Sequence, residues 1–160
     1  MIILETDRLL LRTTTLDDTN DLYEQVFSNE DVVQFTFGRE GLSIEETKEF
    51  IKDNCNFDSK LGLSTLIEKK SGNIIGLAGN IECNYLEEKD YEFGFILGKD
   101  FWGQGYATEI GKAQIDFIKN ELKAKRVLAL VHKDNIGSIK TIEKLSLIHL
   151  TTVQTDGRGN

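Results

Sequence analysis

Residues 101–111 read Phe-Trp-Gly-Gln-Gly-Tyr-Ala-Thr-Glu-Ile-Gly, and they join a strand pattern at 91–97 to a helix pattern at 108–121. Glycine lets the backbone adopt turns that a Cβ would block, and it lets a ligand approach the main chain closely. The start of a helix adds unpaired N–H groups and the positive end of the helix dipole. The segment therefore predicts a cradle for phosphate oxygens at a strand-to-helix turn. The alternative is a loop that merely starts a helix.

Two common nucleotide-binding motifs do not fit this segment. A G-x-G-x-x-G motif that starts at Gly103 needs a glycine at position 108, where the chain has Thr108. A P-loop that ends at residue 112 needs a glycine at 106 and Ser or Thr at 113, but the chain has Tyr106 and Ala113. Dinucleotide-binding and NTPase functions are therefore disfavoured, and another phosphate-bearing ligand is expected.

With its block Trp102-Gly103-Gln104-Gly105-Tyr106-Ala107, the chain resembles the GNAT superfamily of acetyl-CoA-dependent N-acetyltransferases, whose pyrophosphate loop reads Q/R-x-x-G-x-G/A. Trp102 replaces the first Gln or Arg, and this departure resembles the ribosomal-protein N-terminal acetyltransferase (Rim-like) branch. Three further blocks resemble the family in the same order along the chain: 5–12, 92–97 and 135–144. The resemblance covers nearly the whole sequence.

The resemblance implies an α/β (α+β) protein with the GNAT fold, a central mixed twisted sheet flanked by helices, in a single domain over residues 1–160. The periodicity of the chain agrees with the order β-α-α-β-β-β-α-β-α-β. Strands are expected at 8–13, 63–68, 74–82, 91–97, 126–131 and 147–153. Helices are expected from 15 or 17 to 28, and at 43–57, 108–121 and 135–145.

Two strands near the end of the sequence carry specific expectations. The near-continuous apolar run 126–131 predicts a strand that is buried on both faces. The family usually adds a last strand beside it, and the sequence reaches residue 160 where that strand would begin, so the final strand is expected to be absent or truncated. An uncovered sheet edge tends to associate, which favours a homodimer.

Composition narrows the classes of function. The chain has 160 residues, 39% hydrophobic and 29% charged, which suits one soluble domain. We find no signal peptide and no apolar run of membrane-spanning length, so we expect a cytoplasmic protein without a membrane partner. A net charge of −8 disfavours a nucleic-acid partner and suits a cationic substrate. Cys55 and Cys83 lack metal-ligand spacing, so no metal is expected.

Acetyl-CoA is the co-substrate that the resemblance implies. Main-chain N–H groups of 104–108 are expected to bind its pyrophosphate, and the strand at 95–97 is expected to pair with its pantetheine amides and to polarise the acetyl oxygen. The predicted contacts are Phe95, Ile96, Leu97, Trp102, Gly103, Gln104, Gly105, Tyr106, Ala107, Thr108, Asn135 and Ser138.

The catalytic groups are less sharply indicated. Glu92 is the predicted general base, because burial of a carboxylate on a central strand is costly unless the group is solvated or has a function. The alternative is that Glu92 is only a solvated or salt-bridged carboxylate. Glu82 and Asp90 are weaker candidates for the base. Many GNAT enzymes have a tyrosine seven residues after the asparagine of the last helix, where this chain has Ile142. Ser138 is expected to donate a hydrogen bond to the leaving sulfur instead. The alternative is that its side chain only bonds the backbone at the start of its own helix.

We therefore expect a transferase that moves an acetyl group to a primary amine by direct attack in a ternary complex. The acceptor is a protein N-terminal amine or a small-molecule amine, with its specificity in the loops at 35–42 and 84–90. The alternative is a non-catalytic acyl-CoA-binding or regulatory module.

Overall fold

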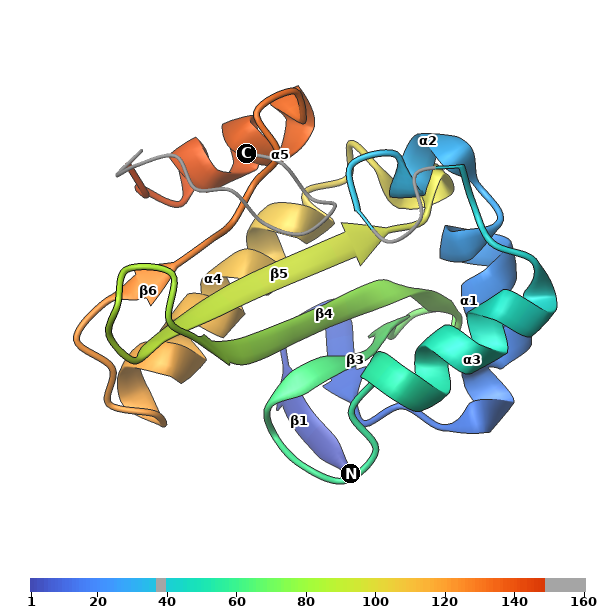
Figure 1. Ribbon diagram of the computed structural model, residues 1–160, viewed down its shortest axis with the longest axis horizontal. Coiled ribbons are helices and arrows are strands. Elements are labelled where there is room, and N and C mark those ends of the chain that lie inside the picture. Colours follow the sequence, from blue (N-terminus) through green and yellow to red (C-terminus); the bar gives the residue numbers. More distant parts are fainter. Residues whose placement is uncertain (37–39, 149–160) are drawn as a thin grey trace.

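The computed structural model describes residues 1–36 and 40–148 (Figure 1). Its centre is a sheet of six strands in sequence order. They are β1 (Ile2–Glu5), β2 (Leu9–Arg12), β3 (Gly62–Glu68), β4 (Ile74–Cys83), β5 (Asp90–Leu97) and β6 (Val127–Leu128). Neighbouring strands from β1 to β5 are antiparallel, and β5 and β6 are parallel. The mixed sheet flanked by helices, as expected for the GNAT fold, is thus confirmed.

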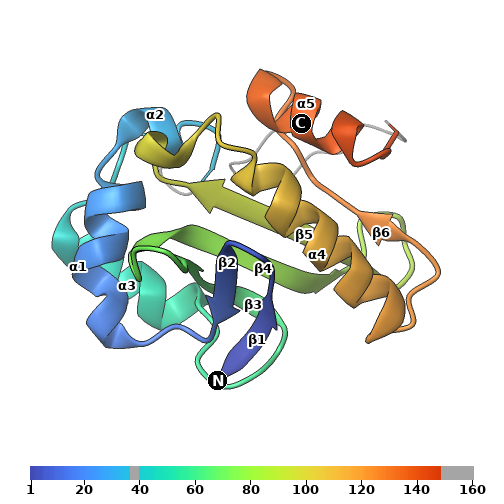
Figure 2. The same ribbon diagram turned by 180° about the vertical axis from the view of Figure 1, so that it is seen from behind.

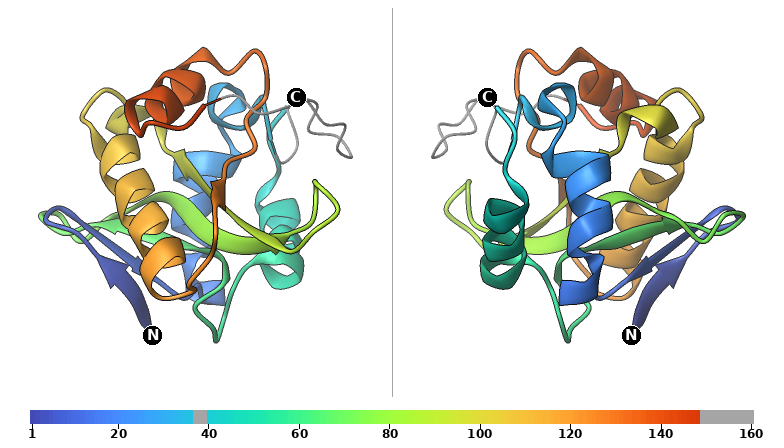
Figure 3. Two further views of the ribbon diagram at one scale, coloured as in Figure 1. Left: turned by 90° about the vertical axis from the view of Figure 1, so that its left-hand side faces the viewer. Right: turned by 90° about the vertical axis from the view of Figure 1, so that its right-hand side faces the viewer.

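Helices cover both faces of this sheet (Figures 2 and 3). The first helical segment joins η1 (Leu16–Asp18), α1 (Thr19–Leu22) and the π-helical turn η2 (Tyr23–Phe27), and it is followed by α2 (Glu30–Val33) and α3 (Ile44–Asn54). On the opposite face lies α4 (Tyr106–Asn120), preceded by η3 (Lys99–Phe101), and α5 (Ile136–Lys144) follows β6. None of the helices among the described residues is long and apolar enough to cross a membrane.

Strand β4 divides the core into two apolar clusters. Its Ile75 and Ala78 lie in the cluster that includes Ile110 of α4, whereas Leu77 lies in the cluster that includes Phe27 and Ile51. All of these side chains are fully buried. Burial of one large aliphatic side chain contributes roughly 1.5–3 kcal/mol, so both helical layers are held firmly against the centre of the sheet.

Most of the expected elements are confirmed, and two short ones were missed. Residues 2–5 form a strand of their own, β1, and α2 lies in a segment that the sequence left irregular. Helix α5 begins after Asn135, whose side chain accepts a hydrogen bond from the Ser138 amide at 3.3 Å, as expected for an N-cap. The strand expected at 147–153 lies largely outside the described residues.

The prediction for 126–131 was wrong in length and in burial. Only Val127 and Leu128 pair, with Tyr91 and Glu92 of β5, and the whole run is half-buried. Beyond Leu128 the chain leaves the sheet and rises toward α5, while β5 continues to Leu97 (Figure 1). The two strands therefore diverge, and an opening forms along the last residues of β5.

Candidate active site

The turn between β5 and α4 has the geometry of an anion cradle. Gly103 and Gly105 have φ angles of +75° and +83°, which side-chain-bearing residues rarely adopt. A Cβ at Gly103 would meet no atom within 4 Å, so the turn faces open space. The first α4 amide with a helical partner is that of Glu109, which donates to the Gly105 carbonyl at 3.0 Å. The amides of 106–108 therefore precede the helical ladder, and the turn fits a phosphate group.

Arg8, immediately before β2, holds this turn in place through its side chain. Its Nη1 donates to the Gln104 carbonyl at 2.9 Å, and its Nε donates to Glu109 Oε1 at 2.6 Å. Its guanidinium also lies 4.3 Å from the ring centroid of Tyr106. Burial alone would raise the pKa of Glu109, but hydrogen bonds from Thr6 and Arg8 outweigh it and hold that pKa below its ordinary value. These contacts of Arg8 were not predicted from the sequence, although Arg8 stands in the resembling block 5–12.

Tyr106 anchors the first turn of α4 in the core. Its hydroxyl donates to Glu68 Oε2 at 2.6 Å, and Ser71 Oγ donates to the other oxygen of Glu68 at 2.7 Å. The bond to Glu68, together with burial, raises the pKa of the Tyr106 hydroxyl. Only 1% of Tyr106 is exposed, so its ring holds the glycine turn against the core.

A cavity of about 500 Å³, here called the turn cavity, lies between the glycine turn, the end of β5 and α5. All the predicted acetyl-CoA contacts except Gln104 line it. Gln104 is turned away, because its carbonyl accepts from Arg8 and its Nε2 donates to the Asp100 carbonyl at 3.1 Å. Lys144 of α5 also lines the cavity and brings a positive charge to it.

The edge of β5 contributes main-chain groups to the turn cavity. The Gly98 amide donates to the Ile75 carbonyl of β4 at 2.8 Å, so by the alternation of a strand the main-chain groups of Phe95 and Leu97 face the opposite way, toward the opening. The indole N–H of Trp102 donates to the Leu97 carbonyl at 2.9 Å. Phe95 is therefore the residue whose N–H and carbonyl are best placed to meet a ligand as a neighbouring strand would.

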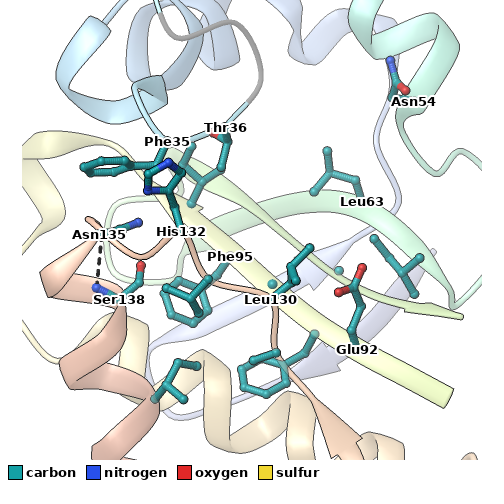
Figure 4. Close-up of a pocket in the computed structure, with 18 of the residues that line it drawn as sticks. Phe35, Thr36, Asn54, Leu63, Glu92, Phe95, Leu130, His132, Asn135 and Ser138 are labelled. Carbon is teal, nitrogen blue, oxygen red and sulfur yellow. Dashed lines mark hydrogen bonds between the residues drawn. The ribbon is translucent and has the colours of Figure 1, made fainter. Parts of the chain in front are cut away.

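A second cavity of about 330 Å³, here called the Glu92 cavity, continues along the same opening. It shares Phe95, Ser138 and Asn135 with the turn cavity. Figure 4 shows Phe95 and Leu130 between Ser138 on one side and Glu92 on the other. A molecule in the turn cavity and one in the Glu92 cavity would therefore meet near Phe95 and Ser138.

Glu92 is a buried carboxylate with 6% of its surface exposed. The Tyr85 hydroxyl donates to its Oε1 at 2.9 Å. The two weaker candidates lie outside both cavities. Arg126 holds Asp90 through two hydrogen bonds of 2.8 Å, which lower the pKa of that carboxyl, and Glu82 is exposed and 3.4 Å from the Lys89 ammonium.

The start of α5 brings its polar groups to the junction of the cavities. Ser138 lines both of them, and Ile142, which stands where the family has its tyrosine, lines the Glu92 cavity. Asn135 caps the helix and lines both cavities as well, so its two expected roles are geometrically compatible. In the part of the chain that the structure describes, no three His, Cys, Asp or Glu side chains are arranged to hold a metal ion.

Comparisons with known proteins agree with this architecture. Residues 8–147 match the family model described as acetyltransferase (GNAT) domain. The protein YkkB of Bacillus subtilis (strain 168) is 28% identical over 153 residues, which cover 94% of this chain and 88% of YkkB. The N-acetyltransferase YoaA of the same organism is 30% identical over 147 residues, which cover 89% of this chain and 81% of YoaA.

Solved structures share the fold at lower identity. A GNAT-family acetyltransferase from Bacillus anthracis superposes with a TM-score of 0.79 at 23% identity, covering 99% of this chain and 92% of that one. Spermidine N-acetyltransferase from Vibrio cholerae, in complex with CoA and spermine, gives 0.71 at 20% identity, covering 92% and 85%. RimL, the ribosomal L7/L12 α-N-protein acetyltransferase in complex with coenzyme A, gives 0.68 at 16% identity, covering 90% and 82%.

Proposed function

The chain belongs to the acetyltransferase (GNAT) family, and we propose that it transfers the acetyl group of acetyl-CoA to a primary amine. In this proposal the amine attacks the thioester directly, in a ternary complex. The observation that carries the proposal is the pair of adjoining cavities, one beside a glycine turn that fits a phosphate and the other beside a buried carboxylate. Two substrates bound side by side need such a pair.

Acetyl-CoA supplies the acyl thioester and occupies the turn cavity. The main-chain amides that follow Gly105 bind the diphosphate, and the positive charge of Lys144 adds to this attraction. The N–H and carbonyl of Phe95 pair with the pantetheine arm, and the N–H polarises the acetyl oxygen at the junction of the cavities. Asn135 and Ser138 line the side of the pantetheine arm that faces away from Phe95.

The acceptor amine occupies the Glu92 cavity. Amines carry a proton at neutral pH, and Glu92 takes that proton, directly or through one water molecule. The nitrogen lone pair then forms the bond to the acetyl carbon, the carbon–sulfur bond breaks with its electrons on sulfur, and the second proton lost by nitrogen neutralises the sulfur as the thiol. Ser138, which lines both cavities, donates a hydrogen bond to the departing sulfur.

Two of the structural neighbours give examples of acceptors that the proposal has to consider. One is a spermidine N-acetyltransferase and the other acts on the α-amine of a ribosomal protein. Both acceptors are primary amines. At 16% identity the likeness to RimL concerns the fold, so the Rim-like assignment rests on the block at 102–107 and is part of this proposal.

One observation favours a second candidate function, an acyl-CoA-binding module without turnover. Ile142 lines the Glu92 cavity at the position where the family places its tyrosine, and an alkyl side chain cannot donate a proton to the leaving sulfur. In that case the chain would bind acetyl-CoA in the turn cavity and transfer nothing.

Replacement of Glu92 by Gln separates the two functions. The amide keeps the shape of the side chain and still accepts from Tyr85, so the proposal predicts that kcat falls by about 10²–10⁴ while the affinity for acetyl-CoA stays within about twofold. The matched control is Glu82→Gln, an exposed glutamate on the neighbouring strand outside both cavities, which should leave kcat unchanged. Acetyl-CoA binding without acetylation of any amine by the unmodified protein would favour the binding module.

A further inference from the structure

The walls of the Glu92 cavity are largely apolar. They combine side chains from β3, β4, β5 and the segment after β6 with one from the segment after α2: Leu63, Ile81, Phe95, Leu130, Val131 and Phe35. The ring of Phe35 packs against His132 with centroids 5.1 Å apart and an interplanar angle of 35°. Figure 4 shows Phe35, Leu63, Phe95 and Leu130 around the opening, with the Glu92 carboxylate among them. The cavity thus offers mostly apolar surface with one acidic side chain, and its other polar side chains, within the described part of the chain, are Thr36, Asn54, His132, Asn135 and Ser138.

Among the residues that the structure describes, Glu92 is the only acidic side chain that lines this cavity. Three acids on neighbouring elements have cationic partners. Asp90 and Glu88 both bind Arg126, each at 2.8 Å. Farther along the opening, Asp31 lies 2.6 Å from the ammonium of Lys99. The net charge of the whole chain is −8, but among the described residues only one acidic side chain lines this cavity.

One carboxylate balances one ammonium group. A second ammonium on the same acceptor would have to enter an apolar cavity without a counter-charge, and burial of an unpaired charge is strongly unfavourable. An alkyl or aromatic group in its place would gain from burial against the same walls. The volume of about 330 Å³ is at the small end of ligand sites, which suits one amine and one apolar group of side-chain size.

We infer that the acceptor of this transferase is a primary amine joined directly to an apolar or aromatic group and lacking a second cationic group, and that polyamines are poor acceptors. The inference rests on the proposed function, since it takes the Glu92 cavity as the acceptor site. It separates this chain from the spermidine N-acetyltransferase that shares its fold. The acetylation step itself is unchanged: the nitrogen–carbon bond forms, the thioester carbon–sulfur bond breaks, and the two nitrogen protons pass to Glu92 and to the thiol.

The test compares matched acceptors in a thiol-release assay with saturating acetyl-CoA. Hexylamine and 1,5-diaminopentane have the same number of non-hydrogen atoms, and they differ in whether the far end is a methyl group or an ammonium. We expect kcat/KM for hexylamine to exceed that for the diamine by at least about tenfold. Phenethylamine should rank with hexylamine, and spermidine with the diamine.

A variant should reduce this preference by adding a second carboxylate. Asn54, at the end of α3, is exposed and lines the Glu92 cavity, so Asn54→Asp places a carboxylate of the same size at its mouth. The variant loses the hydrogen bond that Asn54 Nδ2 donates to the Phe50 carbonyl at 3.1 Å, which frees the new carboxylate from its own helix. We expect the ratio of diamine to hexylamine activity to rise by about threefold, since the new pair is partly exposed to solvent. The matched control is Asn73→Asp in the β3–β4 turn, which should leave the ratio unchanged.

The outcomes separate this inference from the function on which it rests. Diamine or spermidine turnover equal to or above that of hexylamine would overturn the inference and leave the acetyltransferase function intact. Retained acetyl-CoA binding with no thiol release from any amine of the panel would overturn the proposed function, and the inference with it. A hexylamine preference that Asn54→Asp diminishes supports both.

Discussion

Replacement of Gly105 by Ala should weaken coenzyme A binding at least about tenfold, in addition to a loss of stability that a control glycine variant shares. Gly105 has φ +83° and precedes the first turn of α4. An alanine there costs about 1–2 kcal/mol in the left-handed region, and its Cβ would lie 3.3 Å from an Arg8 terminal nitrogen. The backbone is expected to relax, which misaligns the amides that follow. Each hydrogen bond to a charged group contributes about 1.5–3 kcal/mol, so loss of one raises Kd at least about tenfold.

The β3–β4 turn provides the control for backbone strain. Gly72 has φ +74°, and a Cβ there would meet nothing within 4 Å, so Gly72→Ala carries the same conformational cost at a site remote from both cavities. Each variant should lower Tm by about 2–8 °C, at about 2–4 °C per kcal/mol for a domain of this size. Only Gly105→Ala should lose coenzyme affinity.

Binding can be followed by intrinsic fluorescence, because the chain contains one tryptophan. Trp102 lines the turn cavity and is 46% exposed, so a coenzyme bound there should change its emission. Titration of the unmodified protein and of the two glycine variants gives the three dissociation constants. An unchanged Kd for Gly105→Ala, with the expected loss of Tm, would refute the assignment of the turn as the diphosphate site.

Two further predictions concern the contacts of Arg8 with the glycine turn and the pH dependence of stability. Arg8→Lys removes the planar guanidinium that bonds both Gln104 and Glu109, so Kd for acetyl-CoA should rise about three- to tenfold while kcat at saturation is unchanged. The control Arg126→Lys should leave Kd unchanged, and a Kd change in the control alone would contradict the role of Arg8. Hydrogen bonds from Tyr106 and Arg126 hold the pKa values of Glu68 and Asp90 below their ordinary 4.5 and 3.8. The unfolded chain then binds more protons as the pH falls, so Tm should be constant above about pH 5.5 and should drop as the pH falls through 4 toward 3; a Tm that rises on acidification would contradict the sign.

The sequence alone indicated the local backbone geometry of the candidate site. The glycine turn, the start of α4 and the Asn135 cap each follow from a few consecutive residues whose backbone preferences are strong. The turn cavity then gathers nearly all the residues that the family resemblance indicated. Gln104 is the exception, because its carbonyl accepts from Arg8, a residue distant in the sequence, and its side chain donates to the Asp100 carbonyl.

Contacts between distant segments were beyond sequence reasoning. Nothing in the spacing of Arg8 and Glu109, or of Tyr106 and Glu68, indicates that these side chains meet across the fold. The run 126–131 illustrates a second limit. Its apolar composition indicates removal from water, but Leu130 lies in a cavity wall and only two residues of the run join the sheet. Composition does not distinguish a core strand from the lining of a ligand site.

A crystal structure of the protein with bound coenzyme A would show directly whether the glycine turn holds the diphosphate. We expect the diphosphate oxygens to accept hydrogen bonds from main-chain N–H groups between residues 103 and 108, with the pantetheine arm along the Phe95 edge of β5. Coenzyme A bound at another surface, or no bound coenzyme at saturating concentration, would contradict it.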